Sequence, residues 1–162
     1  GIDSFDIDAD SLSAMSVAED QAGFAMEVFA ARSIGHATLD ISDRHKTTSQ
    51  RLISFSGAED TRAKTYVVAQ LLAHPDTIVD SATGLFAPTD AVIEMNCARS
   101  EIAAVESSSN STSDSAQPRT TAENSSDDSR QQSLGILTSM IADRVDLALT
   151  WGYPSFDEAL FE

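Results

Sequence analysis

The feature that most constrains the fold is a long serine-rich tract in the second half of the chain. Residues 107–133 read SSSNSTSDSAQPRTTAENSSDDSRQQS, in which alanine is the only apolar residue type. A tract this poor in apolar side chains cannot bury enough surface to offset the entropy lost when it is ordered. We therefore expect a solvated, flexible linker at 107–133. It separates a main block at 1–106 from a C-terminal block at 134–162.

The charge of the chain excludes several classes of partner. The 162 residues carry a formal net charge of −16 and a pI of about 4.2. Such a field repels nucleic-acid phosphates and anionic membrane surfaces, so we expect no direct nucleic-acid partner. The sequence has no apolar run of the roughly 18 residues that a transmembrane helix needs, so we expect no membrane insertion. Proteins or copies of the chain itself remain as expected partners.

Hydrophobic periodicity predicts three helices in the main block. Ser16 and Glu19 have the spacing of a capping box and introduce a helix that ends near Gly35. Ser56 and Glu59 repeat this spacing before a second helix that ends at His74, which precedes a proline. A third helix is expected from 88–89 to 106, because its apolar residues recur every three or four positions.

Between the first two helices the period of the sequence changes. The stretches HATLDIS and RLISFS alternate apolar and polar residues, so we expect a β-hairpin at 36–42 and 51–56, joined by a long polar loop. The stretch at 76–89 is expected to form a short strand or an irregular connection. The predicted fold class is α+β and mainly α-helical, with one β-hairpin, three to four helices and a long serine-rich insert.

The C-terminal block contains a clear amphipathic helix at 134–151, with Ser133 as its expected N-cap. One apolar face runs along it through Leu134, Leu137, Ile141 and Val145. A lone helix cannot bury such a face in water, so it must dock, either on the main block or on another chain. Gly152 and Pro154 end this helix.

The N-terminal stretch DSFDIDADS raises the question of a metal site. Asp6, Asp8 and Asp10 match the start of a calcium-binding loop, but the glycine and the final carboxylate that the loop requires are missing. The alternation of acidic and apolar residues favours an extended arm at 1–15. The aspartates would lie on its solvent-exposed face, and Phe5 and Ile7 would pack against a neighbour. The three aspartates are thus only weak metal candidates.

The sequence indicates no catalytic centre and no cofactor. His36, His45 and His74 are too scattered for a metal-ligand set, so structural roles are favoured, with His45 in a polar loop. Cys97, the only cysteine, excludes an intrachain disulfide and favours a small packed side chain. A pair between His36 and Asp40 is interpreted as a surface contact.

Three functional hypotheses follow. The first is a non-catalytic structural or interaction subunit of a larger assembly, such as a coat-protein segment or an accessory subunit, with Phe5, Ile7 and the apolar face of 134–151 as its contact surface. The second is a small enzyme, which requires Asp40, His36 or His45, and Asp90 or Glu94 to converge in one pocket. The third is a divalent-cation module built on Asp6, Asp8 and Asp10.

Overall fold

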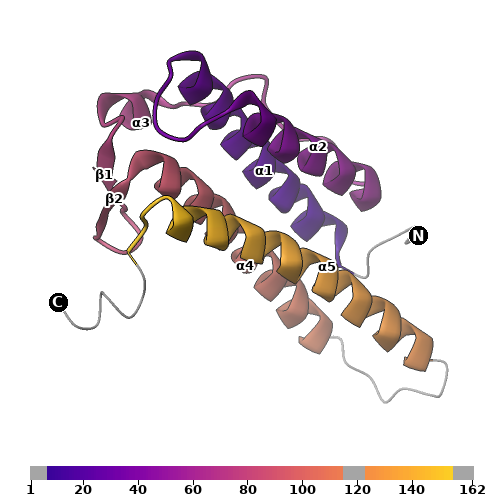
Figure 1. The fold of residues 1–162 in the computed structure, drawn as a ribbon. Coiled ribbons are helices and arrows are strands. Elements are labelled where there is room, and N and C mark those ends of the chain that lie inside the picture. The colour runs from indigo at the N-terminus through magenta and orange to yellow at the C-terminus, as the bar shows by residue number, and fades with distance from the viewer. Residues whose placement is uncertain (1–6, 115–122, 155–162) are drawn as a thin grey trace.

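In the computed structural model the chain is a bundle of four long helices with a small hairpin at one end (Figure 1). The structure describes the backbone of residues 7–114 and 123–154, and the side chains of residues 7–108 and 131–154. The elements are α1 (Ala9–Ala31), α2 (Leu39–Ser56), α3 (Ala69–Ala73), β1 (Thr77–Val79), β2 (Phe86–Pro88), α4 (Thr89–Asp114) and α5 (Glu123–Thr150). The expectation of a mainly helical α+β fold with one hairpin is confirmed.

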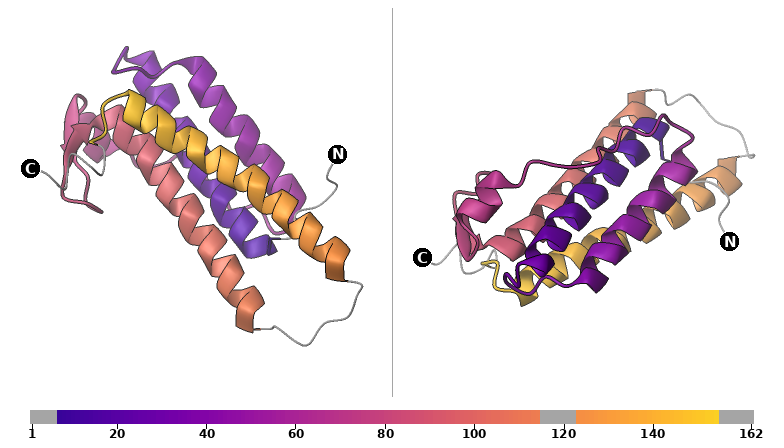
Figure 2. Two further views of the ribbon diagram at one scale, coloured as in Figure 1. Left: turned by 60° about the horizontal axis from the view of Figure 1, so that its bottom comes forward. Right: turned by 90° about the horizontal axis from the view of Figure 1, so that it is seen from above.

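The helices form two antiparallel pairs, α1 with α2 and α4 with α5 (Figures 1 and 2). Helix α1 also packs against α4, so α1 and α4 form the central contact of the bundle. Residues 57–88, which include α3 and the hairpin, carry the chain from the end of α2 back to the other end of the bundle. This crossover makes α2 and α4 run in the same direction.

The N-terminal aspartates cap a helix, and the extended arm predicted at 1–15 is wrong for its described part. Asp8 is the N-cap of α1, because its side chain accepts a hydrogen bond from the Ser11 amide at 2.7 Å. Asp10 lies in the first turn, where a negative charge complements the helix dipole. Ile7 is buried against its own bundle. Phe5 and Asp6 lie outside the described residues.

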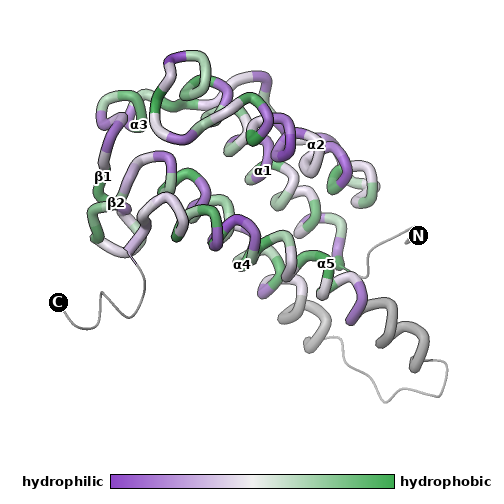
Figure 3. Tube along the Cα trace, viewed as in Figure 1, coloured by the Kyte–Doolittle hydropathy of each residue, from purple (hydrophilic) through white to green (hydrophobic). Residues whose placement is uncertain are grey.

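The hairpin predicted at 36–42 and 51–56 is also wrong, because α2 runs through most of both segments. Thr38 caps this helix by accepting from the Ile41 amide, and Gly57 ends it in the left-handed conformation at φ 69°. The tube of α2 shows little green in the hydropathy view (Figure 3). Its buried face is formed largely by serine and histidine, so hydrophobic periodicity could not reveal it.

The true hairpin lies in the stretch that was expected to be a short strand or connection. Strands β1 and β2 pair antiparallel with Ile78 opposite Ala87. The second helix of the main block is much shorter than predicted, since only Ala69–Ala73 is helical; it ends at its expected C-cap, His74. The third helix begins at Thr89 as expected and continues past 106 to Asp114.

Most of the predicted linker at 107–133 is helical, so a structureless tract is wrong for its described backbone, while its solvation stays a prediction. Helix α4 covers 107–114 and α5 covers 123–133, while 115–122 lies outside the described residues. Serine disfavours a helix by only about 0.5 kcal/mol per residue, so a serine-rich composition does not by itself exclude a helix. The predicted domain boundaries after 106 and 133 fall inside helices, and the division into domains stays a prediction.

Helix α5 covers the bundle of its own chain. Leu137 is fully buried with Leu12, Met15 and Leu52, and Leu134 packs on the same cluster. Ile141 and Val145 are half-buried. The predicted docking of 134–151 is therefore intramolecular over this face. Within the described residues, no helix is long and apolar enough to cross a membrane.

Candidate functional site

Small polar residues bring α1 and α2 into close contact at two levels. At one level, Ser42 Oγ donates to the Gly23 carbonyl at 2.7 Å. At the other, Ser16 Oγ donates to the Ser49 carbonyl at 2.8 Å, and Ser49 Oγ donates to the Ser16 carbonyl at 2.7 Å. The residues enclosed between these two levels are Glu19 on α1 and His45 on α2, and both point into the bundle.

The imidazole of His45 bridges two buried carboxylates. Its Nδ1 lies 2.8 Å from Glu19 Oε1, and its Nε2 lies 2.6 Å from Glu94 Oε2. The histidine is 2% exposed and both glutamates are 0% exposed. Burial lowers the pKa of His45, but hydrogen bonds to Glu19 and Glu94 outweigh it and raise the net pKa above its usual value. The ring therefore connects α1 on one side with α4 on the other.

Arg144 reaches Glu19 from α5. Its Nη2 donates to Glu19 Oε1 at 2.8 Å, and its Nε donates to Oε2 at 3.1 Å. Burial raises the pKa of Glu19, yet the hydrogen bonds from His45 and Arg144 bring it down to about 2. Glu19 is therefore ionised and receives charged donors from two other helices.

Cys97 and Glu101 complete the arrangement from α4. Cys97 Sγ donates to Glu19 Oε2 at 3.1 Å and lies 3.7 Å from Glu101 Oε1. Burial raises the pKa of the Cys97 thiol, and the negative charge of Glu19 raises it further. Burial and the charge of Glu19 also raise the pKa of Glu101 to about 10, so this carboxyl is neutral at pH 7.

We refer to these six side chains, drawn from all four long helices, as the core cluster: Glu19, His45, Glu94, Cys97, Glu101 and Arg144. Two of its oxygens, Glu94 Oε1 and Glu101 Oε2, are buried and have no hydrogen-bond partner among the described residues. An unpaired buried polar atom costs about 1–3 kcal/mol, and natural proteins contain few of them. The core cluster is thus incomplete as a purely structural network.

The core cluster contains donor atoms of the types that bind transition metals. One ligand atom each from Glu19, His45 and Cys97 lie within 4.8 Å of one another. A carboxylate oxygen, an imidazole nitrogen and a sulfur are the usual ligands of zinc and its neighbours. Cys97 also lines a cavity of about 310 Å³, together with residues of α1, of α4 and of the segment around α3.

The residues named for the enzyme hypothesis do not all converge. His45 and Glu94 meet in the core cluster. His36 instead pairs with Asp90 at 2.8 Å and stacks on Trp151, with ring centroids 5.3 Å apart. Asp40 is exposed and lines a separate groove between α2 and α5. No single pocket of the described residues contains the full set.

Two of the single-residue interpretations need revision. His45 lies in the middle of α2 and not in a polar loop. The interpretation of Cys97 as a small packed side chain is confirmed for its burial, but its carboxylate neighbours were not foreseen. Asp8 uses its carboxylate to cap α1, and the metal hypothesis for Asp6, Asp8 and Asp10 stays a prediction.

A signal for the core cluster exists in the sequence of α4. Glu94, Cys97 and Glu101 follow one another at spacings of three and four, so they share one face of a helix. That face overlaps the apolar residues Ala91, Met95 and Ala98, whose spacing of four and three residues is part of the pattern that predicts this helix. Acidic residues on a core-facing stripe are the signal that the apolar pattern obscures.

Comparison with known proteins assigns no relationship. No family model matches the chain, and no curated protein or solved structure shows a significant match to it.

Proposed function

We propose that the chain is a metal-binding helical bundle, which holds one divalent transition-metal ion such as zinc in the core cluster. Glu19, His45 and Cys97 are the proposed ligands. Binding would need the thiolate of Cys97 and an unprotonated nitrogen of His45, so it would release protons to the solvent. The observation that carries the proposal is the convergence of these three donor types, from three different helices, on one buried point beside two unpaired carboxylate oxygens.

The energetics of the core cluster support a functional role. Six ionisable side chains in the middle of a bundle are expensive, because apolar residues of similar volume are often equally or more stabilising. Metal ions in four-helix bundles are typically held by glutamate and histidine side chains that project inward from facing helices. A metal ion would give the unpaired oxygens of Glu94 and Glu101 a partner.

Arg144 fits this proposal as a charge-balancing residue. Glu101 is neutral without metal, but a metal-bound thiolate of Cys97 and the carboxylates of Glu19 and Glu94 would leave an excess of negative charge beside a divalent ion. The guanidinium of Arg144 offsets part of that excess while its two donors orient the Glu19 carboxylate. Hydrogen bonds of this kind to a ligand commonly tune metal affinity.

The earlier hypothesis of an interaction subunit stays a prediction beside this one. Its contact surface included the apolar face of 134–151, which packs largely on the chain itself.

Isothermal titration of the chelator-treated chain with zinc tests the proposed function. We expect one zinc ion per chain, and His45→Gln should weaken binding by about tenfold or more. His36→Gln is the matched control, because it removes an imidazole that also contacts a carboxylate but lies outside the core cluster. Circular dichroism establishes that each variant is folded.

Cys97→Ser provides a second variant if His45→Gln does not fold, since it replaces the thiol with a hydroxyl and changes the side-chain volume little. It should also weaken zinc binding by about tenfold or more. Absence of zinc binding by the folded wild type would overturn the proposal. Equal losses in His36→Gln and His45→Gln would overturn the assignment of the site.

A further inference from the structure

The core cluster contains two carboxyl groups besides the three ligands assigned to the metal ion. Glu94 and Glu101 both project from α4 and are fully buried, and each has one oxygen with no hydrogen-bond partner among the described residues. Zinc sites with four protein ligands are closed and structural, whereas sites with three leave a position for water or a substrate. Whether either carboxyl group reaches the ion therefore decides what the metal can do.

Glu101 lies where a fourth ligand is needed. Its Oε1 is 3.7 Å from Sγ of Cys97. Two donor atoms on one tetrahedral zinc ion lie roughly 3.3–3.8 Å apart, given bond lengths of about 2.0–2.3 Å. Cys97 and Glu101 are also four residues apart on α4, which is the helical spacing that brings two side chains of one face to a shared metal ion.

The contact between Glu101 and Cys97 is at most a weak hydrogen bond. The thiol has one proton, and its shorter contact is with Glu19 Oε2 at 3.1 Å. Without metal, the carboxyl group of Glu101 is neutral, which allows it to lie beside the negative charge of Glu19. As a ligand, Glu101 would exchange its proton for the ion, as the thiol of Cys97 does.

Glu94 is engaged on the far side of the imidazole. Its Oε2 lies 2.6 Å from Nε2 of His45, while the other ring nitrogen, Nδ1, faces Glu19. When Nδ1 binds the ion, Nε2 keeps its proton and donates it to Glu94. A carboxylate that accepts from a ligating histidine in this way orients the ring and supports metal affinity. Glu94 is thus placed to contact the ligand His45 and not the ion.

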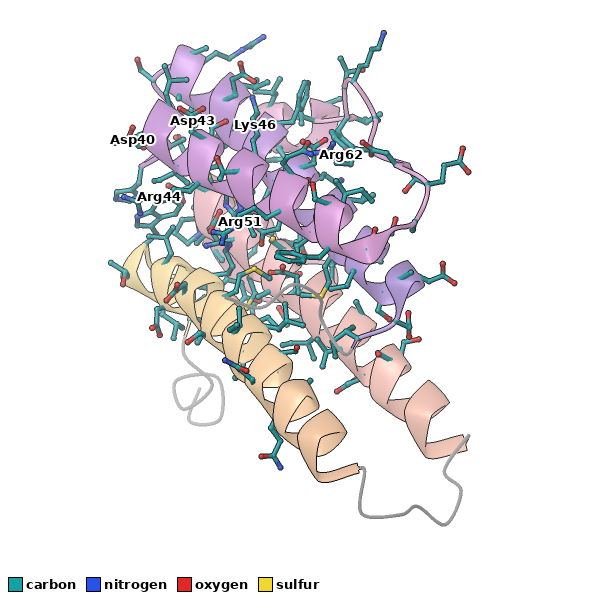
Figure 4. The ribbon with its side chains drawn as sticks, turned by 90° about the vertical axis from the view of Figure 1, so that its right-hand side faces the viewer. Asp40, Asp43, Arg44, Lys46, Arg51 and Arg62 are labelled. Carbon is teal, nitrogen blue, oxygen red and sulfur yellow. The ribbon has the colours of Figure 1, made fainter. Side chains whose placement is uncertain are left out.

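Most of the core cluster is screened from two neighbouring cavities. The groove between α2 and α5, whose lining includes Arg44 and Arg51 (Figure 4), reaches the core cluster at Arg144 alone. The cavity of about 310 Å³ reaches it at Cys97 alone. The other members of the core cluster line neither cavity, which favours a site without an exchangeable water ligand.

We propose that Glu101 is the fourth ligand of the metal ion, which closes the site and gives the ion a structural role. This inference rests on the proposed function, from which it takes the other three ligands. The ion would connect α1, α2 and α4 from the inside of the bundle, and it would have no free position for a substrate.

Visible absorption of the full-length chain loaded with cobalt(II) tests the proposal, because the d–d bands depend on the atoms bound to the metal. We expect sodium azide, a small anion that binds an open metal position, to leave the bands of the wild type unchanged. Glu101→Ala should weaken cobalt binding at least about tenfold and shift the bands. Azide should shift them again, because the truncation leaves an open position and space for the anion.

Glu101→Gln is the second variant if Glu101→Ala does not fold, and it should also shift the bands. Glu94→Gln is its matched control, because it makes the same change in the other carboxyl group on this face of α4. Glu94→Gln should weaken cobalt binding by about tenfold, since the acceptor of the His45 hydrogen bond loses its charge. Its bands should keep their wild-type positions and stay insensitive to azide. Circular dichroism establishes that each variant is folded.

Three results would overturn the assignment of Glu101 while the wild type still binds one equivalent of cobalt. The first is a shift of the wild-type bands with azide, which would show an open position. The second is wild-type bands in the Glu101 variants. The third is a band shift in Glu94→Gln, which would make Glu94 a ligand. A folded wild type that binds no cobalt would instead overturn the proposed function together with this inference.

Discussion

Nε2 of His45 lies 2.6 Å from Oε2 of Glu94, and both side chains are shielded from solvent in the middle of the bundle. Helices α2 and α4 are not direct packing neighbours, so this contact connects them across the bundle interior. The same ring holds Glu19 on α1 through its other nitrogen. The centre of the fold is therefore organised by a proton-bearing side chain where most bundles of this size have apolar packing.

Glu19 makes more hydrogen bonds than any other member of the core cluster. Replacing it with glutamine, its neutral analogue, should therefore strongly destabilise the fold. In the metal-free chain, Glu19→Gln leaves Arg144 and His45 buried without their main counter-charge, at an expected cost of about 3–5 kcal/mol. Urea unfolding in the presence of a chelator measures this loss.

Glu27→Gln is the matched control for that experiment. Glu27 also lies on α1 and pairs with Lys46, but its side chain is 49% exposed. An exposed pair of this kind contributes about 0–1 kcal/mol. If Glu19→Gln lost no more stability than Glu27→Gln, the core cluster would not be the electrostatic centre of the fold.

The close contact of α1 with α2 predicts opposite effects for two glycine substitutions. A Cβ at Gly23 would lie 3.1 Å from the Ser42 carbonyl oxygen and 3.0–3.1 Å from the side chains of Lys46 and His45. We expect Gly23→Ala to destabilise the chain by about 1 kcal/mol or more, because the backbone of α2 must move. Gly135, inside α5, has no atom within 4 Å of such a Cβ.

Gly135→Ala should therefore stabilise the chain by about 0.5–1 kcal/mol, through helix propensity alone. Thermal unfolding of the two alanine variants under identical conditions separates packing from propensity. Stabilisation by both substitutions would show that α1 and α2 are not in close contact at Gly23.

Asp80, which lies outside the core cluster, predicts that the folded state loses stability in acid. Burial raises the pKa of Asp80, but hydrogen bonds from Tyr153, the Ala82 amide and Arg99 lower the net pKa below the usual 3.8. A lowered pKa stabilises the folded state above pH 3.8, and this stabilisation is lost as the pH falls through the folded-state value.

Asp80→Asn should accordingly cost about 1–3 kcal/mol at pH 6, and its difference from the wild type should shrink below pH 3.8. Unfolding by urea between pH 3 and 7 measures this difference. The exposed Asp76→Asn is the control and should show little effect at any pH. A difference between the wild type and Asp80→Asn that stayed constant with pH would contradict the assignment.

The sequence predicted the helices whose buried face is apolar and missed the one whose buried face is polar. Helix α5 and the start of α4 follow ordinary hydrophobic spacing and were found. Helix α2 buries Ser42, His45 and Ser49. In the sequence, this core-facing set of polar residues resembles a solvated loop. A short alternation around Ile41 and Ile53 then imitated a strand.

The core cluster could not be predicted from the sequence for a related reason. Glu19 and Ser16 have the spacing of a capping box, which gave them a local explanation at a helix start. In the structure both lie inside α1 and contact residues far away in the sequence. Only the three-dimensional packing of four helices brings Glu19 together with Arg144, which is 125 positions away.

Cobalt(II) absorption spectroscopy tests the central claim most directly, because Cys97 is the only thiol in the chain. The account predicts that one equivalent of cobalt produces a sulfur-to-metal charge-transfer band in the near ultraviolet, and that Cys97→Ser abolishes this band while the variant stays folded. A cobalt-saturated wild type without the band, or a band that persists in Cys97→Ser, would contradict a metal site in the core cluster.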